Sequence, residues 1–212
     1  MSKIIVKDLA GPSSSSNKIY IASGSELDIA NSSGTINLAV DAADIASGTL
    51  SNARLAAGHI LQVKYAKKTD TFSTTSTSYV DLTDLSVSIT PSSTDSKILV
   101  SWSVETGQAN NASHLYLIVA RDTTENIFVG DSAGSRTGAS NVGNMVDAES
   151  EMQILSNNFL DSPSTTSATT YKLRIKSSNG TEVFVNRSKR DNDAAAFDGR
   201  ACSSLVVMEV KA

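Results

Sequence analysis

Alternation of apolar and polar residues in short segments is the feature that most limits what the second part of this chain can fold into. In "LSVSITP", Leu85, Val87 and Ile89 alternate with serines, so one face of the segment is apolar and the other polar. No stretch of about ten residues carries a convincing helical period. Seven more segments alternate or run apolar, namely 61–66, 97–104, 114–122, 126–130, 171–178, 182–188 and 205–211. The pattern predicts an all-β domain over residues 59–212, an antiparallel β-sandwich or jelly roll.

Turn-forming residues separate these segments. "SSNGT" at Ser177–Thr181 contains Asn-Gly, the strongest short hairpin signal, between two expected strands. Val146–Phe159 fits a short helix or a strand, and we favour a strand because polar Ser and Asn follow closely. Gly130–Met145 is rich in Gly, Ser and Asn without apolar rhythm. Such a long connection is either a functional loop or a flexible surface segment.

The first 58 residues follow a different pattern, with apolar residues placed singly and glycines that follow serines. At about 25 cal/mol per Å² of apolar area, such a segment cannot offset about 1–2 kcal/mol of backbone entropy per residue. It is therefore either disordered or ordered by several copies that pool their apolar residues. The near-repeat of "IASGS" at Ile21 and "IASGT" at Ile45 favours an intertwined β stalk over residues 19–58.

Composition narrows the partners. The net charge of −4 argues against nucleic acid, which normally demands a basic surface. No apolar run approaches the roughly 20 residues of a membrane span, and the apolar patch near the N-terminus is too short for a signal peptide. We therefore expect folding in a cytosol. Cys202 is the single cysteine, so it forms no intrachain disulfide, and we expect a small buried apolar side chain there.

Candidate chemistry is sparse. Histidine occurs only at His59 and His114, and the chain has neither a G-x-S-x-G elbow nor a complete phosphate loop. Oxygen ligands for a metal come nearest together in "DLTD" (Asp81–Asp84) and "DND" (Asp191–Asp193), which we interpret as turns, with a weak Ca²⁺ site as the alternative. We expect no enzyme, no cofactor and no metal. The main strand carboxylates are expected to face solvent, namely Glu105, Glu182 and Glu209.

Four stretches of the sequence resemble a known group of proteins. "DAADIASGTLSNARLAAG" resembles the D-I-x-x-G-T-(I/L)-x-x-A-R-(I/L) signature of bacteriophage tail-fibre and other fibre proteins. "ILQV" and "STSYVDLTDLSVSITPSSTDSKILV" resemble the β-rich C-terminal domain of marine phage structural proteins, and "MSKIIVKDL" resembles the short strand that opens them. The resemblance covers most of residues 1–104. It implies a parallel homotrimer in the virion, assembled in the host cytoplasm.

The resemblance also implies an organisation in three parts. Residues 1–18 are expected to dock onto another virion protein of the tail, baseplate or capsid through an added strand at Ile4, Ile5 and Val6. Residues 19–58 form the trimeric stalk, and residues 59–212 form the head.

Two roles follow for such a protein. As a short tail fibre or spike it would attach to a bacterial surface glycan or protein, with multivalency raising the avidity. As a capsid decoration, head fibre or tail adaptor it would stabilise the virion without binding a receptor, and the few aromatic residues favour this alternative because glycan-binding loops often use rings. The residues expected to contact a receptor lie in loops, namely Asn110, Asn111, Arg136, Asn141, Arg187 and Arg190.

Overall fold

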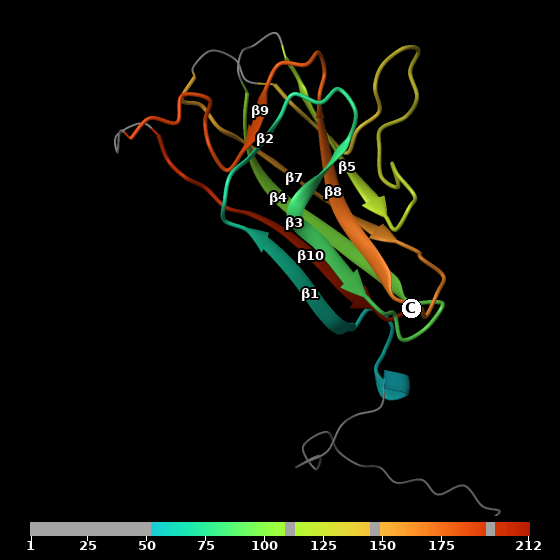
Figure 1. Ribbon diagram of the computed structural model, residues 1–212. Coiled ribbons are helices and arrows are strands. Elements are labelled where there is room, and N and C mark those ends of the chain that lie inside the picture. The colour runs from blue at the N-terminus through green and yellow to red at the C-terminus, as the bar shows by residue number, and fades with distance from the viewer. Residues whose placement is uncertain (1–51, 109–112, 145–148, 194–197) are drawn as a thin grey trace, which may run out of the picture. The chain divides into compact units, whose positions relative to one another are not determined.

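The computed structural model describes residues 52–108, 113–144, 149–193 and 198–212 (Figure 1). Residues 1–51, which include Ile4, Ile5, Val6 and most of the predicted stalk, lie outside the described residues, as do Asn110 and Asn111. Leu50–Ala212 forms one compact unit. Its described strands are β1 (Ile60–Lys68), β2 (Phe72–Thr74), β3 (Val80–Ile89), β4 (Lys97–Gln108), β5 (Leu115–Arg121), β6 (Asn141–Gly143), β7 (Gln153–Asp161), β8 (Thr169–Ser177), β9 (Val183–Val185) and β10 (Ser203–Val210).

The strands build two antiparallel sheets, which confirms the prediction of an all-β fold and is consistent with a β-sandwich. The six-stranded sheet has the order β1-β10-β4-β9-β2, and β7 pairs with the opposite edge of β4. The four-stranded sheet has the order β3-β8-β5-β6. In Figure 1, β2 and β9 lie at one end of this unit, and the C-terminus lies at the other, near the 3₁₀ turn Asn52–Arg54.

The core lies between the two sheets and is formed by one alternating face of each strand. On β3, Leu85, Val87 and Ile89 are buried, whereas the serines between them are exposed, as predicted. Inward residues of β4, β8 and β10 complete the same cluster, among them Trp102, which is 3 % exposed. Burying a large aliphatic or aromatic side chain contributes about 1.5–3 kcal/mol, so this alternation accounts for the fold.

The Asn-Gly turn after β8 does not close a hairpin, so that prediction is wrong. β8 belongs to the four-stranded sheet, whereas β9 pairs with β2 and β4 in the other sheet. Gly180 adopts a φ of 86°, which glycine reaches without strain. The turn therefore carries the chain from one sheet to the other.

The predicted strand 182–188 is shorter than expected because Asn186 ends it. Asn186 is fully buried with a φ of 62°, and its amide donates to the carbonyls of Lys68 and Asp70. The backbone just after Asn186 passes close to Gly107 on β4. Only glycine fits there, since a Cβ would lie 2.5 Å from the Arg187 carbonyl oxygen.

Segment 126–130 is not a strand, which corrects the prediction from its apolar residues. Asn126 has a φ of 58°, so the chain leaves the extended conformation there. The Phe128 ring stacks on Phe159 at 4.6 Å and meets Trp102 edge-on at 6.2 Å. These apolar residues cover the side of the core instead of pairing in a sheet.

Two further expectations are corrected. Asp81–Asp84 lies within β3 instead of a turn, and the strand accommodates a bulge there, with Asp84 at a φ of 67°. Cys202 is exposed, not buried, because it precedes the first inward residue of β10, Ser203. The strand favoured within Val146–Phe159 is confirmed in its second half, where β7 begins at Gln153.

Candidate functional site

A row of four apolar side chains crosses the outer face of the six-stranded sheet. Val63 of β1 pairs with Met208 of β10, Met208 pairs with Leu99 of β4, and Leu99 pairs with Leu160 of β7. Their sequence neighbours on β4 and β10, such as Val100 and Val207, are fully buried in the core. Because successive side chains of a strand point to opposite faces, the row lies on the side away from the core.

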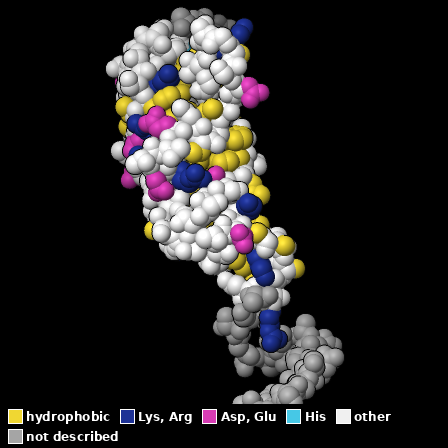
Figure 2. Space-filling model, turned by 90° about the vertical axis from the view of Figure 1, so that its right-hand side faces the viewer, with side chains coloured by type: hydrophobic (Ala, Val, Ile, Leu, Met, Phe, Trp, Pro, Cys, Tyr) yellow, Lys and Arg dark blue, Asp and Glu magenta, His cyan; other side chains and the backbone are white. Residues whose placement is uncertain are grey.

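Further apolar residues of β1 and β10 extend this row into a patch, which we call the apolar face. Val63 and Leu160 are 52 % and 54 % exposed, and Tyr65 is 70 % exposed. Figure 2 shows apolar side chains gathered toward the right-hand border of that view. The apolar face consists of Ile60, Val63, Tyr65, Leu99, Leu160, Val206, Met208 and Val210. A contiguous exposed apolar surface marks an interaction site more often than scattered apolar residues do.

The apolar face occupies one end of its sheet. Farther along β4, the outward side chains are Ser101 and Ser103, and their partners on β7 are Asn158 and Ser156. The apolar end is where β1 begins, a few residues after the 3₁₀ turn Asn52–Arg54. A second molecule on this face would therefore contact the sandwich near residue 52.

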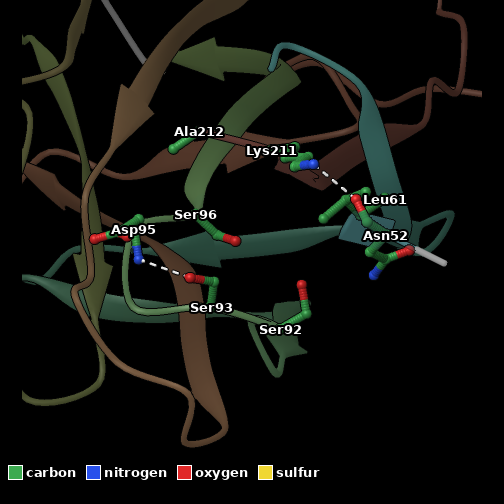
Figure 3. Close-up of a pocket in the computed structure, with 8 residues that line it drawn as sticks. All are labelled: Asn52, Leu61, Ser92, Ser93, Asp95, Ser96, Lys211 and Ala212. Carbon is green, nitrogen blue, oxygen red and sulfur yellow. Dashed lines mark hydrogen bonds between the residues drawn. The ribbon is translucent and has the colours of Figure 1, made fainter. Parts of the chain in front are cut away.

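A small pocket of about 280 Å³ lies at the same end, where β1 begins and β10 ends (Figure 3). Lys211 donates from Nζ to the carbonyl oxygens of Asn52, at 2.7 Å, and of Leu55. On the opposite wall, the Asp95 N–H donates to the Ser93 hydroxyl at 3.2 Å. The Lys211 bonds hold the segment before β1 against the residue after β10, and the Asp95–Ser93 bond closes a turn within the Pro91–Ser96 loop.

Glu209 is the buried group behind this pocket, which corrects the expectation that it faces solvent. It is 1 % exposed, and its Oε1 accepts hydrogen bonds from the hydroxyls of Ser92 and Ser96, each at 2.6 Å, and from the Ser92 N–H. Gln62 donates to Oε2 at 2.6 Å. Burial opposes ionisation, but the hydrogen bonds outweigh it and hold the Glu209 pKa below its usual range. The carboxylate therefore stabilises this end of the sandwich.

Arg136 and Asn141, two residues predicted to contact a receptor, have different surroundings in the structure. Arg136 is exposed and donates to the nearby Ala133 carbonyl at 3.2 Å. Asn141 opens β6, where its Oδ1 accepts a 2.8 Å hydrogen bond from the Trp102 indole N–H. Its Nδ2 also donates to the Ser156 carbonyl. Asn141 therefore holds a core side chain in place.

The two predicted arginines after β9 lie close together and have intramolecular contacts. Arg187 stacks on the Phe184 ring at 4.1 Å and pairs with Asp191 at 3.6 Å. Arg190 pairs with Asp198 at 2.9 Å. Receptor contact by Arg187 and Arg190 stays a prediction, and both side chains form ion pairs within the chain.

The apolar face was not predicted from the sequence, although one signal was present. In "LVVMEV" at the end of the chain, Leu205 and Val207 alternate with Val206 and Met208, so both faces of β10 are apolar. Strands that are apolar on both faces are typically covered on both sides. Within the described residues, one face of β10 packs on the core and the other has no covering layer. The sequence of β10 therefore indicated a second covered face.

Other site types find no support in the described ranges. No three His, Cys, Asp or Glu residues gather there in an arrangement that could hold a metal ion. None of the helices in the part described has the length and apolar character to cross a membrane.

Comparison with solved structures gave thirteen matching chains. No family model matches the chain, and no curated protein matches it significantly. A chain of the solved structure titled "Structure of infectious bursal disease virus Gx strain" is similar, with 12 % identity and a TM-score of 0.39. The match covers 78 % of this chain and 42 % of that one. At this level the likeness carries no argument about function.

Proposed function

We propose that this protein is a non-enzymatic structural component of a bacteriophage virion, a short trimeric tail fibre or spike that contributes to host attachment. The observation that carries the proposal is the apolar face, which the described part of the chain leaves open to water. At about 25 cal/mol per Å², covering such a face with sister chains contributes substantially to association. The fibre-like motif at Asp41–Gly58 ends just before this sandwich and supports the same assignment.

The proposed arrangement joins the N-terminal residues to other virion proteins and exposes the sandwich. Three chains that run in parallel through residues 19–58 would bring three sandwiches together at residue 52. The apolar face lies at that end, so it is suitably placed to contact a neighbouring sandwich. The side away from the contact would face the host.

The alternative is a capsid decoration, head fibre or tail adaptor that stabilises the particle without binding a receptor. One observation favours it. Asn141, expected to contact a receptor, instead accepts a hydrogen bond from the indole N–H of the core residue Trp102.

An adsorption experiment separates the two roles. Purified protein is incubated with host cells before infection, and free phage are counted over time. A fibre that attaches to the host competes, so adsorption slows in proportion to the protein added. Unchanged adsorption, together with loss of particle heat stability when the gene is deleted, would support decoration. Antibody labelling that finds none of the protein on purified virions would refute both roles.

A further inference from the structure

The outer face of the four-stranded sheet carries a polar groove of about 500 Å³. Its walls come from β3, β8 and the turn after β5, which are distant in sequence but adjacent in the sheet. Ala120 of β5 lies at the groove with a short side chain, whereas its partner Lys172 of β8 and the neighbouring Arg174 are long. Ala120 is 1 % exposed, so it forms the closed floor of the groove.

An ion-pair chain fixes the polar groups of this groove. Asp81 pairs with Lys172 at 2.9 Å and with Arg174 at 2.6 Å. Arg174 also pairs with Glu125 and donates from Nη2 to the Tyr79 carbonyl at 2.7 Å. Burial disfavours the charge on Asp81, but Lys172 and Arg174 outweigh it and lower its pKa. Donors and acceptors are therefore held in place before any ligand arrives.

One aromatic ring, that of Tyr79, borders the groove. Tyr79 lines it, and the Lys176 Nζ lies 4.8 Å from the centre of the Tyr79 ring and 5.5 Å from that of Tyr116. Tyr116 in turn stacks with His114, with ring centres 6.4 Å apart. The groove therefore combines an aromatic ring with paired donors and acceptors, and it lies where β3 and β8 meet the turn after β5. Figure 2 shows Lys, Arg, Asp and Glu side chains close together on the left of that view.

The charge balance indicates which ligand fits. Three carboxylates line the groove, those of Asp81, Asp122 and Glu125, against the two cations of Lys172 and Arg174. The net negative charge disfavours phosphate, uronate and other anions. Paired carboxylate and guanidinium groups suit neighbouring hydroxyls, which donate to one and accept from the other.

We propose that this groove binds a neutral sugar unit of a bacterial surface glycan, with the Asp81–Arg174–Glu125 ion pairs receiving its hydroxyls. The inference rests on the proposed function, because it names the ligand class of host attachment. A single groove of this kind is expected to bind weakly, near the millimolar range, and three copies on one particle raise the avidity.

Saturation-transfer NMR on the full-length protein tests the proposal. The neutral probes are D-glucose, D-galactose, D-mannose and N-acetylglucosamine, and the anionic probes are glucuronic acid and N-acetylneuraminic acid. At least one neutral sugar should receive saturation, and more than either acid. Thr123→Trp places a bulky ring at an exposed position of the groove without removing a charge, and should lower the transfer at least about fivefold. Glu125→Ala, at an exposed turn position, removes one acceptor and should also lower it.

The matched control is Ile154→Ser, which changes an exposed apolar residue of the other sheet and should leave the transfer unchanged. Circular dichroism confirms that each variant keeps its strands. Three results would overturn the proposal. They are no saturation transfer to any neutral sugar, stronger transfer to the acids than to the neutral sugars, and transfer in both groove variants equal to that in the wild type. Competition for adsorption by a protein that shows no sugar transfer would overturn this inference alone and leave the proposed function standing.

Discussion

The Tyr171 hydroxyl donates a 2.6 Å hydrogen bond to the Asp161 carboxylate, and the two residues belong to opposite sheets of the sandwich. Arg121 donates to the same Oδ2 atom, also at 2.6 Å. Tyr171 is fully buried, so its hydroxyl has no exposed alternative. Burial, reinforced by the bond to Asp161, raises the pKa of the Tyr171 phenol. The contact joins the end of β7 to β8 and β5 across the core.

Tyr171→Phe removes this bond while preserving the ring. A hydrogen bond to a charged group contributes about 1.5–3 kcal/mol, so the free energy of unfolding should fall by about that amount. Urea denaturation at pH 7 measures it. Ser86→Ala, which removes an exposed hydroxyl of β3, is the control and should leave the midpoint unchanged. Equal midpoints for Tyr171→Phe and the wild type would contradict the assigned bond.

The buried, ionised Glu209 should make the free energy of unfolding depend on pH in the acidic range. Its pKa is lower in the folded protein than in the unfolded chain, so its contribution is complete above the unfolded value near 4.3 and is lost as pH falls through the folded value. Glu209→Gln keeps the shape but removes the charge, and should lower stability by about 1–3 kcal/mol at pH 7. The urea midpoints of wild type and variant should converge as the pH falls through the folded pKa of Glu209. A difference that persists unchanged at low pH would contradict the ionised assignment.

Local alternation predicted which residues of a strand face the core. Tyr171, Leu173 and Ile175 of β8 are all buried and lie at every second position, as in a strand with one inward face. Which sheet a strand joins depends on pairing between distant segments, and no local pattern carries that information. The Asn-Gly turn after β8 shows the limit, because its conformation is that of a turn while its strands pair elsewhere.

The candidate surfaces were harder to predict for the same reason. Leu99 and Leu160 are unremarkable singly, and they become part of one surface only through the register of β4 with β7 and β10. The groove likewise depends on Asp81 and Arg174 facing each other across β3 and β8. The bulge at Asp84 interrupts the alternation of β3. The sequence around Asp81 therefore resembles a turn and not a strand.

Asn141 was expected to contact a receptor, but its hydrogen bond to Trp102 gives it a structural role that can be measured. Trp102 is the single tryptophan of the chain, so its fluorescence reports on this site alone. Asn141→Ala leaves the buried indole N–H without its Asn141 partner, at a cost of about 1–3 kcal/mol. The emission maximum should shift and the urea midpoint should fall. Arg136→Ala, in the same loop but exposed, should change neither.

Cys202 predicts reactivity in the native protein. Because the side chain is exposed, a thiol reagent such as DTNB should label about one thiol per chain without denaturant. Cys202→Ser should abolish the reaction and leave the melting temperature unchanged. A thiol that reacts only after unfolding would place Cys202 in a contact between chains or in the core.

The apolar face predicts how the assembly responds to charge. Val63→Lys and Leu160→Lys place cations at two ends of the row, where burial against a sister chain would cost several kcal/mol per unpaired charge. Each variant should weaken association by tenfold or more, and the double variant should sediment as a single chain of 22.2 kDa instead of three times that mass. Val142→Lys is the matched control, since Val142 is 47 % exposed but lies on the four-stranded sheet. The circular dichroism spectra of all four variants should match that of the wild type. If the double variant keeps the mass of the wild type, the chains associate without the apolar face, through residues 1–51 or another surface, and this face is open to a different partner.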